Sequence, residues 1–453
     1  MKQDFPDDLI REDTREVSMR ILSDREIYTQ EIERIFSRMW MLLGHETEIP
    51  EPGDFVRRTL GNDSVIVSRT RRGTIAVSLN VCPHRGMRVC IAESGNTAVH
   101  RCIYHGWAFR EDGSFIGAPI EREKMHGDVY PKSQLGLRQA KVHIYGGLIF
   151  ATWSADPEPF ESYLGDMRYY LDMLFCRTDA GLEVLGPPQR QLIRANWKTA
   201  GEQSHGDGFH ALTLHRSLMD IGQFGGSNDT IYDNAPSMYG VNVSTDQGHC
   251  LRCLPVEMTF STFMNSDIAK RSLDERLQLA PPQGLPRELL PQLYKHLSKE
   301  QIELLASAAP QSGGLFPNIN VLFLYGPDVS GELVGCLALH IFVPRAVDRF
   351  ELYTWFFAEK AASAEAKARM RSVSIQTMGT SGGIEVDDTE AWPLLTESAF
   401  GLMGSQSTLK YQARTGEHPT PAHWPHPGRV YEGFSKDDAQ WNWWMAYKKA
   451  MQG

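Results

Sequence analysis

The sequence has few features that would place the protein in a membrane or outside the cell. No apolar run approaches the ~18 residues that a membrane-spanning helix needs. The first residues, MKQDFPDDLIRED, bring acidic side chains to the region where a signal peptide has a basic start and an apolar core. We therefore expect a cytoplasmic protein without an export signal or a membrane anchor.

Positive charge is also in short supply. The 453 residues include 46 Lys and Arg against 56 Asp and Glu, which gives a formal net charge of −10 and a pI near 5.9. A net acidic surface disfavours nucleic acid and anionic lipid as main partners. The length suggests about two or three domains, with ample interior for a catalytic centre.

Cysteine is scarce, and only one closely spaced pair occurs. Seven cysteines at mixed spacings fit a reducing compartment, in which some thiols bind metal and the others pack in the interior. Cys250 and Cys253 form a CxxC pair with no second pair at zinc-finger spacing. We therefore predict ordinary buried or idle thiols at these two positions rather than a metal or redox site.

The first third of the chain predicts a helix followed by a small antiparallel β domain. Residues 23–43 have a capping-box pattern at Ser23 and Glu26, then apolar residues at helical spacing up to Gly44. From residue 53 to residue 153, short β-rich runs alternate with Gly-Asn and Arg-Gly turns. The predicted strands are 55–59, 64–68, 74–79 and 147–152.

The remainder of the chain mixes helical and β-rich patterns. Residues 359–378 predict a helix. The predicted strands, which we expect in one sheet, are 321–325, 336–343 and 350–357. The fold class is therefore α+β, with helices covering an antiparallel sheet. Residues 222–287, rich in Gly, Asn, Ser and Pro, are typical of a lid or a pocket wall.

We expect three consecutive parts. An N-terminal helical segment at 1–40 packs on the larger domain, the small β domain covers 41–155, and the larger domain covers 156–453. The last boundary rests on Pro157 and Pro159, because prolines at that density mark a linker more readily than an element.

The small domain contains two short motifs that each offer a thiol and an imidazole. Cys82-Pro83-His84 is followed, after seventeen residues, by Cys102-Ile103-Tyr104-His105. Two Cys and two His are the ligand set of a Rieske [2Fe–2S] cluster, with both Cys on one iron and both His on the other. A structural zinc ion is the alternative. Zinc sites usually pair Cys with Cys in each half, so the mixed halves favour the cluster.

A second concentration of metal-binding side chains lies at 196–215. Within twenty residues this segment holds Glu202, Asp207 and three histidines, His205, His210 and His215, among apolar neighbours. Burying such groups is costly unless a metal or hydrogen bonds compensate, which predicts a site. Two His and one carboxylate bind Fe(II) while leaving positions for dioxygen. Each histidine lies five residues from the next, and five residues rotate an ideal helix by about 140°. Spacing alone therefore does not show which two histidines bind the iron.

Four motifs follow one another along the chain. They are Trp40 to Glu46, the two Cys/His halves, the segment 196–215, and Gly382-Gly383-Ile384-Glu385-Val386-Asp387-Asp388. In this combination the chain resembles the large (alpha) subunit of Rieske non-heme iron aromatic-ring-hydroxylating dioxygenases over nearly its whole length. The resemblance implies a small antiparallel β Rieske domain inserted before a larger catalytic domain of antiparallel sheet covered by helices.

The resemblance also assigns the metal ligands. It implies that the cluster is bound by Cys82, His84, Cys102 and His105, and the mononuclear Fe(II) by His210, His215 and Asp388. Asp387 is the competing carboxylate. The simpler alternative is that Glu385, Asp387 and Asp388 only favour a helix N-terminus, which contributes ~0.3–1 kcal/mol per charge.

Two further residues of the same segment receive catalytic roles from the resemblance, Asp207 and Gln203. Asp207 is expected to bridge His210 and the cluster ligand His105 of a neighbouring subunit, which would also carry the electron path. A path between subunits implies that the working unit is a ring, expected to be a trimer.

The resemblance places the substrate cavity around the same segment. The candidate pocket residues are Gln203, Ser204, His205, Phe209, Ala211, Met219, Ile319 and Val321. For Met219, Ile319 and Val321 simple core packing is the alternative, and for His205 a hydrogen-bonded or solvated imidazole is the favoured interpretation. Ser204 and His205 depart from the common family pattern, which leaves room for a carboxylated, hydroxylated or multi-ring aromatic substrate.

The expected function is a terminal oxygenase component that uses O2 to hydroxylate an aromatic ring, most simply to a cis-dihydrodiol. Electrons come from NADH through a separate reductase and a ferredoxin, because the sequence has no Gly-rich dinucleotide fingerprint and no flavin motif. The expected assembly is an α3 homotrimer or, with a small beta subunit, α3β3. The alternatives are monohydroxylation of a salicylate-like substrate on the same scaffold, and a non-catalytic Rieske electron-transfer protein.

Overall fold

The computed structural model describes residues 5–124, 131–217, 240–255, 268–413, 415, 424–433 and 436–453. Contacts within the chain define two compact units. The small unit is Glu31–Phe160, and the large unit consists of Met1–Gln30 and Glu161–Gly453. Within the described ranges, no helix has both the length and the apolarity needed to cross a membrane.

The small unit is built of antiparallel strands. Strands β6, β5, β4 and β7 form one sheet in that order, β11, β12 and β3 form a second, and β10, β9 and β8 form a third. Their bounds are β3 Met41–His45, β4 Asp54–Leu60, β5 Asp63–Arg69, β6 Ile75–Leu79, β7 Ser94–Asn96, β8 Val99–Arg101, β9 Ala108–Arg110, β10 Phe115–Gly117, β11 Lys141–Tyr145 and β12 Leu148–Thr152. The predicted strands at 55–59, 64–68, 74–79 and 147–152 are confirmed as β4, β5, β6 and β12.

The predicted helix at 23–43 is wrong in its second half. The helical stretch consists of α1 (Arg25–Glu31) and a π-helical turn (Ile32–Phe36), and the chain is extended again in β3. All five residues of β3 are buried, and four of them pair with residues of β12. Strand pairing therefore outweighs the local helical pattern. The cap is also different, because Asp24 Oδ1, rather than Ser23, accepts the backbone N–H of Glu26 at 2.8 Å.

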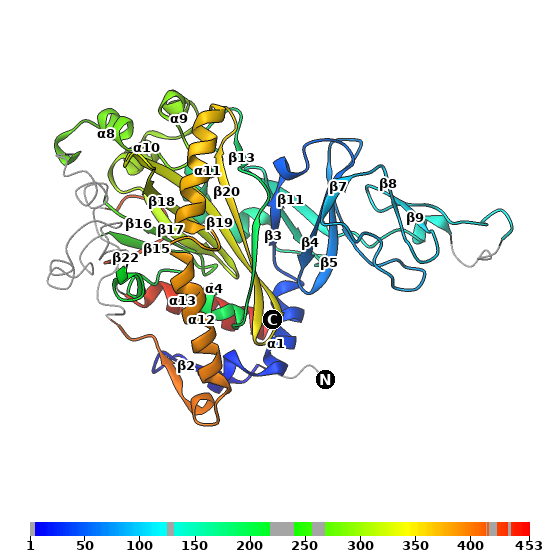
Figure 1. Ribbon diagram of the computed structural model, residues 1–453. Coiled ribbons are helices and arrows are strands. Elements are labelled where there is room, and N and C mark those ends of the chain that lie inside the picture. The colour runs from blue at the N-terminus through cyan, green and yellow to red at the C-terminus, as the bar shows by residue number, and fades with distance from the viewer. Residues whose placement is uncertain are drawn as a thin grey trace. The chain divides into compact units, whose positions relative to one another are not determined.

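In the large unit, nine of the described strands form one antiparallel sheet (Figure 1). Its order is β13-β20-β19-β18-β17-β16-β15-β22, with β14 also paired to β20. The bounds are β13 Leu182–Val184, β14 Gln189–Ile193, β15 Val241–Ser244, β16 Cys250–Cys253, β17 Pro310–Leu315, β18 Ile319–Pro327, β19 Leu333–Ala346, β20 Arg349–Glu359 and β22 Arg429–Glu432. The predicted strands 321–325, 336–343 and 350–357 are confirmed as parts of β18, β19 and β20.

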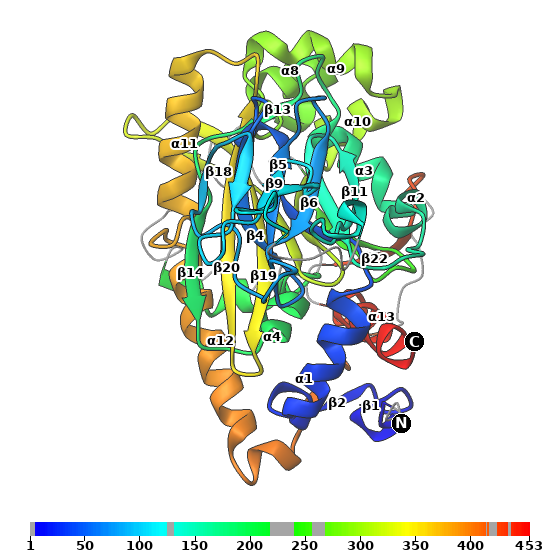
Figure 2. The same ribbon diagram turned by 90° about the vertical axis from the view of Figure 1, so that its right-hand side faces the viewer.

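The large unit also contains helices, of which α4, α11 and α13 contact this sheet. Their bounds are α2 Phe160–Leu164, α3 Met167–Phe175, α4 Trp197–Gln203, α8 Leu273–Leu279, α9 Leu290–His296, α10 Lys299–Ser307, α11 Ala364–Met378, α12 Glu385–Phe400 and α13 Asp438–Gln452. Helices α8, α9 and α10 group at one end of the unit (Figure 2). The predicted helix at 359–378 starts later than expected, at Ala364, because β20 continues to Glu359 and Ser363 Oγ caps the helix by accepting Ala366 N–H at 3.1 Å.

Short elements complete the unit. Strands β1 (Ile10–Arg11), β2 (Glu16–Ser18) and β21 (Thr408–Lys410) form a small sheet, so the start of the chain pairs with a late segment. The described 3₁₀ helices are η1 Asp7–Leu9, η2 Met19–Leu22, η4 Glu46–Glu48, η5 Lys132–Gln134, η6 His210–Leu212, η8 Ile268–Lys270, η9 Arg287–Leu289 and η10 Gly404–Gln406.

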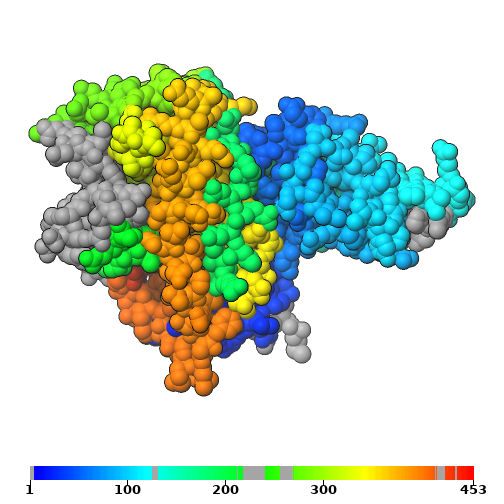
Figure 3. Space-filling model, in the orientation of Figure 1, coloured from blue at the N-terminus to red at the C-terminus, as the bar shows by residue number. Residues whose placement is uncertain are grey.

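One face of the large sheet is covered by α11 and α12, which form a continuous column in the space-filling view (Figure 3). Ala338 of β19 belongs to a buried apolar cluster with Met370 and Val373 of α11. Two residues further along β19, on the same face, His340 Nδ1 lies 3.3 Å from Glu385 Oε1 at the start of α12. This contact brings the first turn of α12 onto the sheet.

Cys250 and Cys253 are the first and last residues of β16, which lies between β17 and β15 in the sheet. Both are buried thiols without a disulfide. Burial is the main reason why the pKa of Cys250 rises to about 12. Such thiols are unreactive, which fits a packing role.

Candidate metal centres

The two Cys/His halves form loops with the same backbone geometry. In the loops 82–87 and 102–107, the cysteine N–H donates to the carbonyl five residues later at 2.8 Å, and the glycine N–H donates back to the cysteine carbonyl at 2.9 Å. Gly86 and Gly106 have φ of +74° and +72°, which favours glycine at both positions. A side chain at Gly106 would also meet Pro119 Cγ at 2.5 Å.

These loops gather the predicted cluster ligands. The rings of His84 and His105 lie 4.6 Å apart between centroids, and His84 stacks on Trp107 at 4.8 Å. Cys82 and Cys102 are buried free thiols. Burial raises the pKa of Cys82 to about 11, so a thiolate there needs a compensating cation. Two buried thiols beside two imidazoles fit a Rieske cluster.

Segment 196–215 begins with a strongly held helix cap. Asn196 Oδ1 accepts Lys198 N–H at 3.1 Å and so caps α4. The Asn196 amide donates to the carbonyls of Leu22 at 3.0 Å and Val347 at 2.7 Å. Helix α4 ends at Gln203, so His210 and His215 lie beyond it on separate turns. His210 and His215 can therefore approach each other without a distorted helix, although they are five residues apart.

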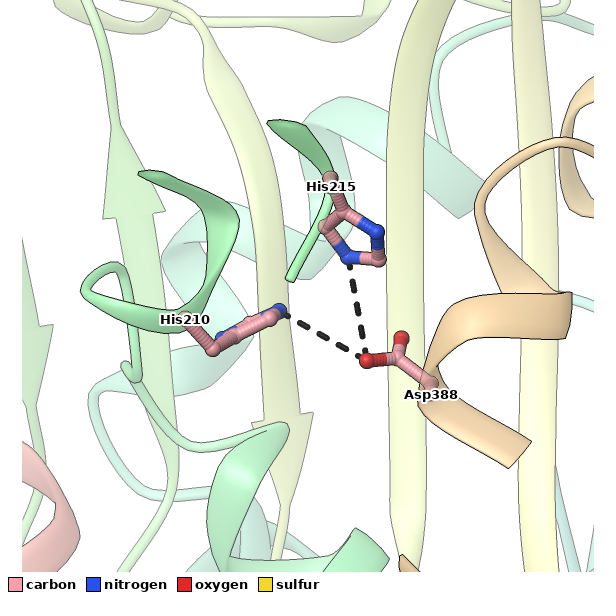
Figure 4. A group of neighbouring side chains, drawn as sticks. All are labelled: His210, His215 and Asp388. Carbon is pink, nitrogen blue, oxygen red and sulfur yellow. Dashed lines mark ion pairs between the residues drawn. The ribbon is translucent and has the colours of Figure 1, made fainter. Parts of the chain in front are cut away.

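His210, His215 and Asp388 converge on one point (Figure 4). One donor atom from each lies within 4.8 Å of the other two. His210 Nε2 and His215 Nε2 are 3.8 and 3.7 Å from Asp388 Oδ1. Burial raises the pKa of Asp388 even though both histidines oppose this, so a cation would stabilise its charged form. The donor set, two imidazoles and one carboxylate, fits non-heme Fe(II).

The second nitrogen of each histidine faces another carboxylate. His210 Nδ1 lies 3.3 Å from Asp207 Oδ2, and His215 Nδ1 lies 3.2 Å from Asp387 Oδ2. Asp207 Oδ1 also accepts the backbone N–H of His210 at 3.2 Å. Carboxylates in this position orient metal-binding histidines.

Gln203 contacts Asp388 directly. Its Nε2 donates to Asp388 Oδ1 at 2.7 Å, and its Oε1 accepts the Trp392 indole N–H at 2.6 Å. Sequence reasoning missed Trp392, although it follows Asp388 by four residues and helical spacing could have placed it on the same face. It also missed the buried pair of His340 and Glu385.

Ser204 and His205 both contact backbone carbonyls of α4. Ser204 Oγ donates to Ala200 O at 2.7 Å, and His205 Nδ1 lies 2.6 Å from Gly201 O. The His205 ring is fully buried, which lowers its pKa to about 3. A Cβ at Gly314 would lie 2.2 Å from His205 Cε1. These contacts fit the interpretation of His205 as a hydrogen-bonded imidazole.

The other pocket candidates lie in different environments. Phe209 is 52% exposed and Ala211 is half-buried, whereas Met219 is outside the described residues. Ile319 and Val321 are buried on β18. Asn320 between them pairs with His340, which faces Glu385, so alternation directs Ile319 and Val321 to the opposite face of the sheet. The structure does not bring these two side chains to the triad, and core packing describes them.

Two families match this chain in succession. Residues 39–137 match the Rieske [2Fe-2S] domain, and residues 160–407 match the catalytic domain of the ring-hydroxylating alpha subunit. The chain therefore belongs to the alpha subunits of Rieske non-heme iron ring-hydroxylating oxygenases. The expected fold class and enzyme class are confirmed.

Individual relatives cover nearly the whole chain. Biphenyl 2,3-dioxygenase subunit alpha of Rhodococcus jostii (strain RHA1) is 32% identical over 439 residues, which cover 96% of this chain and 88% of that protein. The crystal structure of naphthalene 1,2-dioxygenase from Rhodococcus sp. bound to indole superposes with a TM-score of 0.85 at 33% identity, covering 96% and 94%. N,N-dimethyl phenylurea N-demethylase subunit alpha of Sphingobium sp. (strain YBL2) is 32% identical, covering 82% and 77%.

Membership of this family defines the cofactors. They are a Rieske [2Fe–2S] cluster and a non-heme iron, and O2 as oxidant with NADH as electron source through a separate reductase fits the family. Alpha subunits of this family work with a reductase and a ferredoxin on aromatic substrates.

Proposed function

We propose that the protein is the terminal oxygenase component of an aromatic dihydroxylation system. Its cluster is held by Cys82, His84, Cys102 and His105, and its iron by His210, His215 and Asp388. The observation that carries the proposal is the convergence of two Nε2 atoms on Asp388 Oδ1 within 3.8 Å, behind which Asp207 and Asp387 occupy both Nδ1 positions.

The chain's own groups have distinct tasks in this proposal. When bound, the iron supplies open positions at which O2 can react. Asp207 fixes the ring of His210, and Gln203 fixes the carboxylate of Asp388. The side chain of His215 is only 4% exposed, whereas that of His210 is 23% exposed.

Dihydroxylation is supported by relatives named as dioxygenases that match nearly the full chain. The second candidate is monooxygenation, which the N-demethylase relative at 32% identity supports. Turnover of an aromatic panel under ¹⁸O₂ separates the two. Two labelled oxygens in one product indicate cis-dihydroxylation, and a single labelled oxygen indicates monohydroxylation.

A further part of the proposal concerns assembly. We propose that Asp207 bridges His210 and the cluster ligand His105 of a neighbouring subunit, in an α3 homotrimer or an α3β3 complex in the cytoplasm. We further propose three functional parts, namely an N-terminal helical segment at 1–40, the Rieske domain at 41–155 and the catalytic domain at 156–453. Light scattering together with an activity assay tests the proposed trimeric ring. A monomer with full activity contradicts an electron path between subunits.

Metal analysis tests the whole proposal against a pure electron-transfer protein. The oxygenase requires about three irons per chain, because the cluster holds about two and the triad one. Iron at about two per chain in an otherwise fully loaded protein contradicts an iron at the triad.

A further inference from the structure

The acidic residues of the first turn of α12 contact different partners. Asp388 faces the two Nε2 atoms of the triad, whereas Asp387, its neighbour, approaches His215 from the other side of the ring. Asp387 Oδ2 is 3.2 Å from His215 Nδ1. Asp387 therefore faces the nitrogen that points away from the triad, which argues against it as the third ligand.

The side of the ring matters because a neutral imidazole carries a single N–H. A carboxylate at Nδ1 accepts that N–H and leaves the Nε2 lone pair free to bind a cation. Without an acceptor at Nδ1, the proton can reside on Nε2 and block binding. The position of the proton depends on a protein acceptor at His215, because this side chain is only 4% exposed and bulk water has little access to replace the acceptor.

The carboxylate of Asp387 is held on a fixed element. Helix α12 begins at Glu385, whose Oε1 lies 3.3 Å from His340 Nδ1 on β19, and both side chains are buried. Gln203 of α4 also holds α12 at two positions, because its amide donates to Asp388 and its carbonyl oxygen accepts the Trp392 indole N–H. A rigid support of this kind allows one carboxylate to fix the orientation of one ring.

We propose that Asp387 is a positioning residue that sets the tautomer and orientation of His215 for the iron, a proposal that rests on the proposed iron site. The pair parallels Asp207 and His210, where the same two atom types lie 3.3 Å apart. The two histidines are thus oriented from different segments. One turn of α12 supplies both a ligand, Asp388, and the orientation of another ligand, His215.

The test uses protein whose iron has been removed from the triad by chelation while the cluster is retained. Fe(II) affinity is measured for wild type, Asp387→Ala, Asp387→Asn and His215→Ala, together with Glu390→Ala as an exposed acid on the same helix. We expect Asp387→Ala to weaken Fe(II) binding about 10–100-fold. Asp387→Asn should lose much less, because its amide oxygen still accepts the Nδ1–H. Glu390→Ala should match wild type.

A spectroscopic readout complements affinity. The electron paramagnetic resonance spectrum of the Fe(II)–nitric oxide adduct should change in Asp387→Ala and be largely restored in Asp387→Asn. Visible absorption of the cluster reports whether each variant is folded. If Asp387→Ala loses the cluster, Asp387→Asn carries the test, and an Fe(II) affinity in Asp387→Asn as low as in His215→Ala contradicts the proposal.

The outcomes separate this inference from the proposed function. Wild-type affinity and spectrum in Asp387→Ala, or an equal loss in Glu390→Ala, overturn the positioning role. Wild-type Fe(II) binding by His215→Ala overturns the iron site itself. Loss in His215→Ala with none in Asp387→Ala leaves the iron site standing and rejects only the role of Asp387.

Discussion

The amide of Gln203 donates to Asp388 Oδ1 at 2.7 Å while its carbonyl accepts the Trp392 indole N–H at 2.6 Å. The indole thus fixes which way the amide faces, and the amide fixes the carboxylate oxygen that faces both histidines. Gln203 joins α4 to α12 at the triad, although the two segments are 185 residues apart in sequence.

Gln203→Ala should lower kcat about 10–100-fold with little change in KM, because it frees the carboxylate without removing a ligand. The Fe(II) content of the purified variant should fall as well. Trp392→Phe is the matched control, since it keeps an aromatic ring at this position but removes the indole N–H. It should lose less activity than Gln203→Ala. Equal kcat in wild type and Gln203→Ala would show that Asp388 needs no such support.

Asp207→Asn should retain both metal centres but form almost no product. The amide oxygen can still accept the His210 N–H, so iron binding survives, whereas the negative charge of the proposed bridge is lost. Iron analysis and the cluster absorption check loading, and product is counted after one turnover with a pre-reduced cluster. Normal product formation per cluster would rule out Asp207 as the bridge.

The sequence predicted the site's residue types better than their geometry. It identified His210, His215 and Asp388 only through the family pattern, because three histidines at equal spacing do not reveal where a helix ends. The deciding facts are tertiary, namely that α4 stops at Gln203 and that α12 presents Asp388 from far along the chain. Asp387 was a plausible ligand in sequence, and only the side of the His215 ring that it faces distinguishes it from Asp388.

Alternation on strands explains another limit of the sequence. The predicted strand 321–325 lies within β18, yet a shift of one residue exchanges the two faces of a strand. The family resemblance placed Ile319 and Val321 in the pocket, but both are buried on the packed face of β18, whereas Asn320 lies on the face of His340. Likewise, the local apolar spacing predicted a helix where β3 lies. Its strand partner β12 is more than 100 residues later in the sequence, so local spacing did not reveal the pairing.

Gly314→Ala should destabilise the protein by about 1–3 kcal/mol, the usual cost of overpacking. The new Cβ would lie 2.2 Å from His205 Cε1, so either the ring or β17 must move. Thermal unfolding of Gly314→Ala, His205→Ala and the double variant measures the coupling. The double variant should lose less than the sum of the single variants, because removing the imidazole makes room for the methyl group. Simple additivity would show that the ring does not occupy this space.

Stability should depend on pH through Glu202. Burial, followed by the charge of Asp207, raises the pKa of Glu202 from 4.5 to about 8, although Gln440 Nε2 donates to it at 3.0 Å. The folded protein thus holds this proton more tightly than the unfolded chain, so the stabilisation is complete below pH 4.5 and is lost as the pH rises to about 8. The loss is at most about 5 kcal/mol over this range.

Glu202→Gln should remove this dependence, because a neutral amide does not titrate. The midpoint of thermal unfolding, measured from pH 5 to pH 8, should therefore fall less steeply in Glu202→Gln than in wild type, with Glu397→Gln on the exposed surface of α12 as the control. In Asp207→Asn the fall in the unfolding midpoint should end at a lower pH, because the charge of Asp207 no longer raises the pKa of Glu202. Parallel curves for wild type and Glu202→Gln would mean that Glu202 is already ionised in the folded protein.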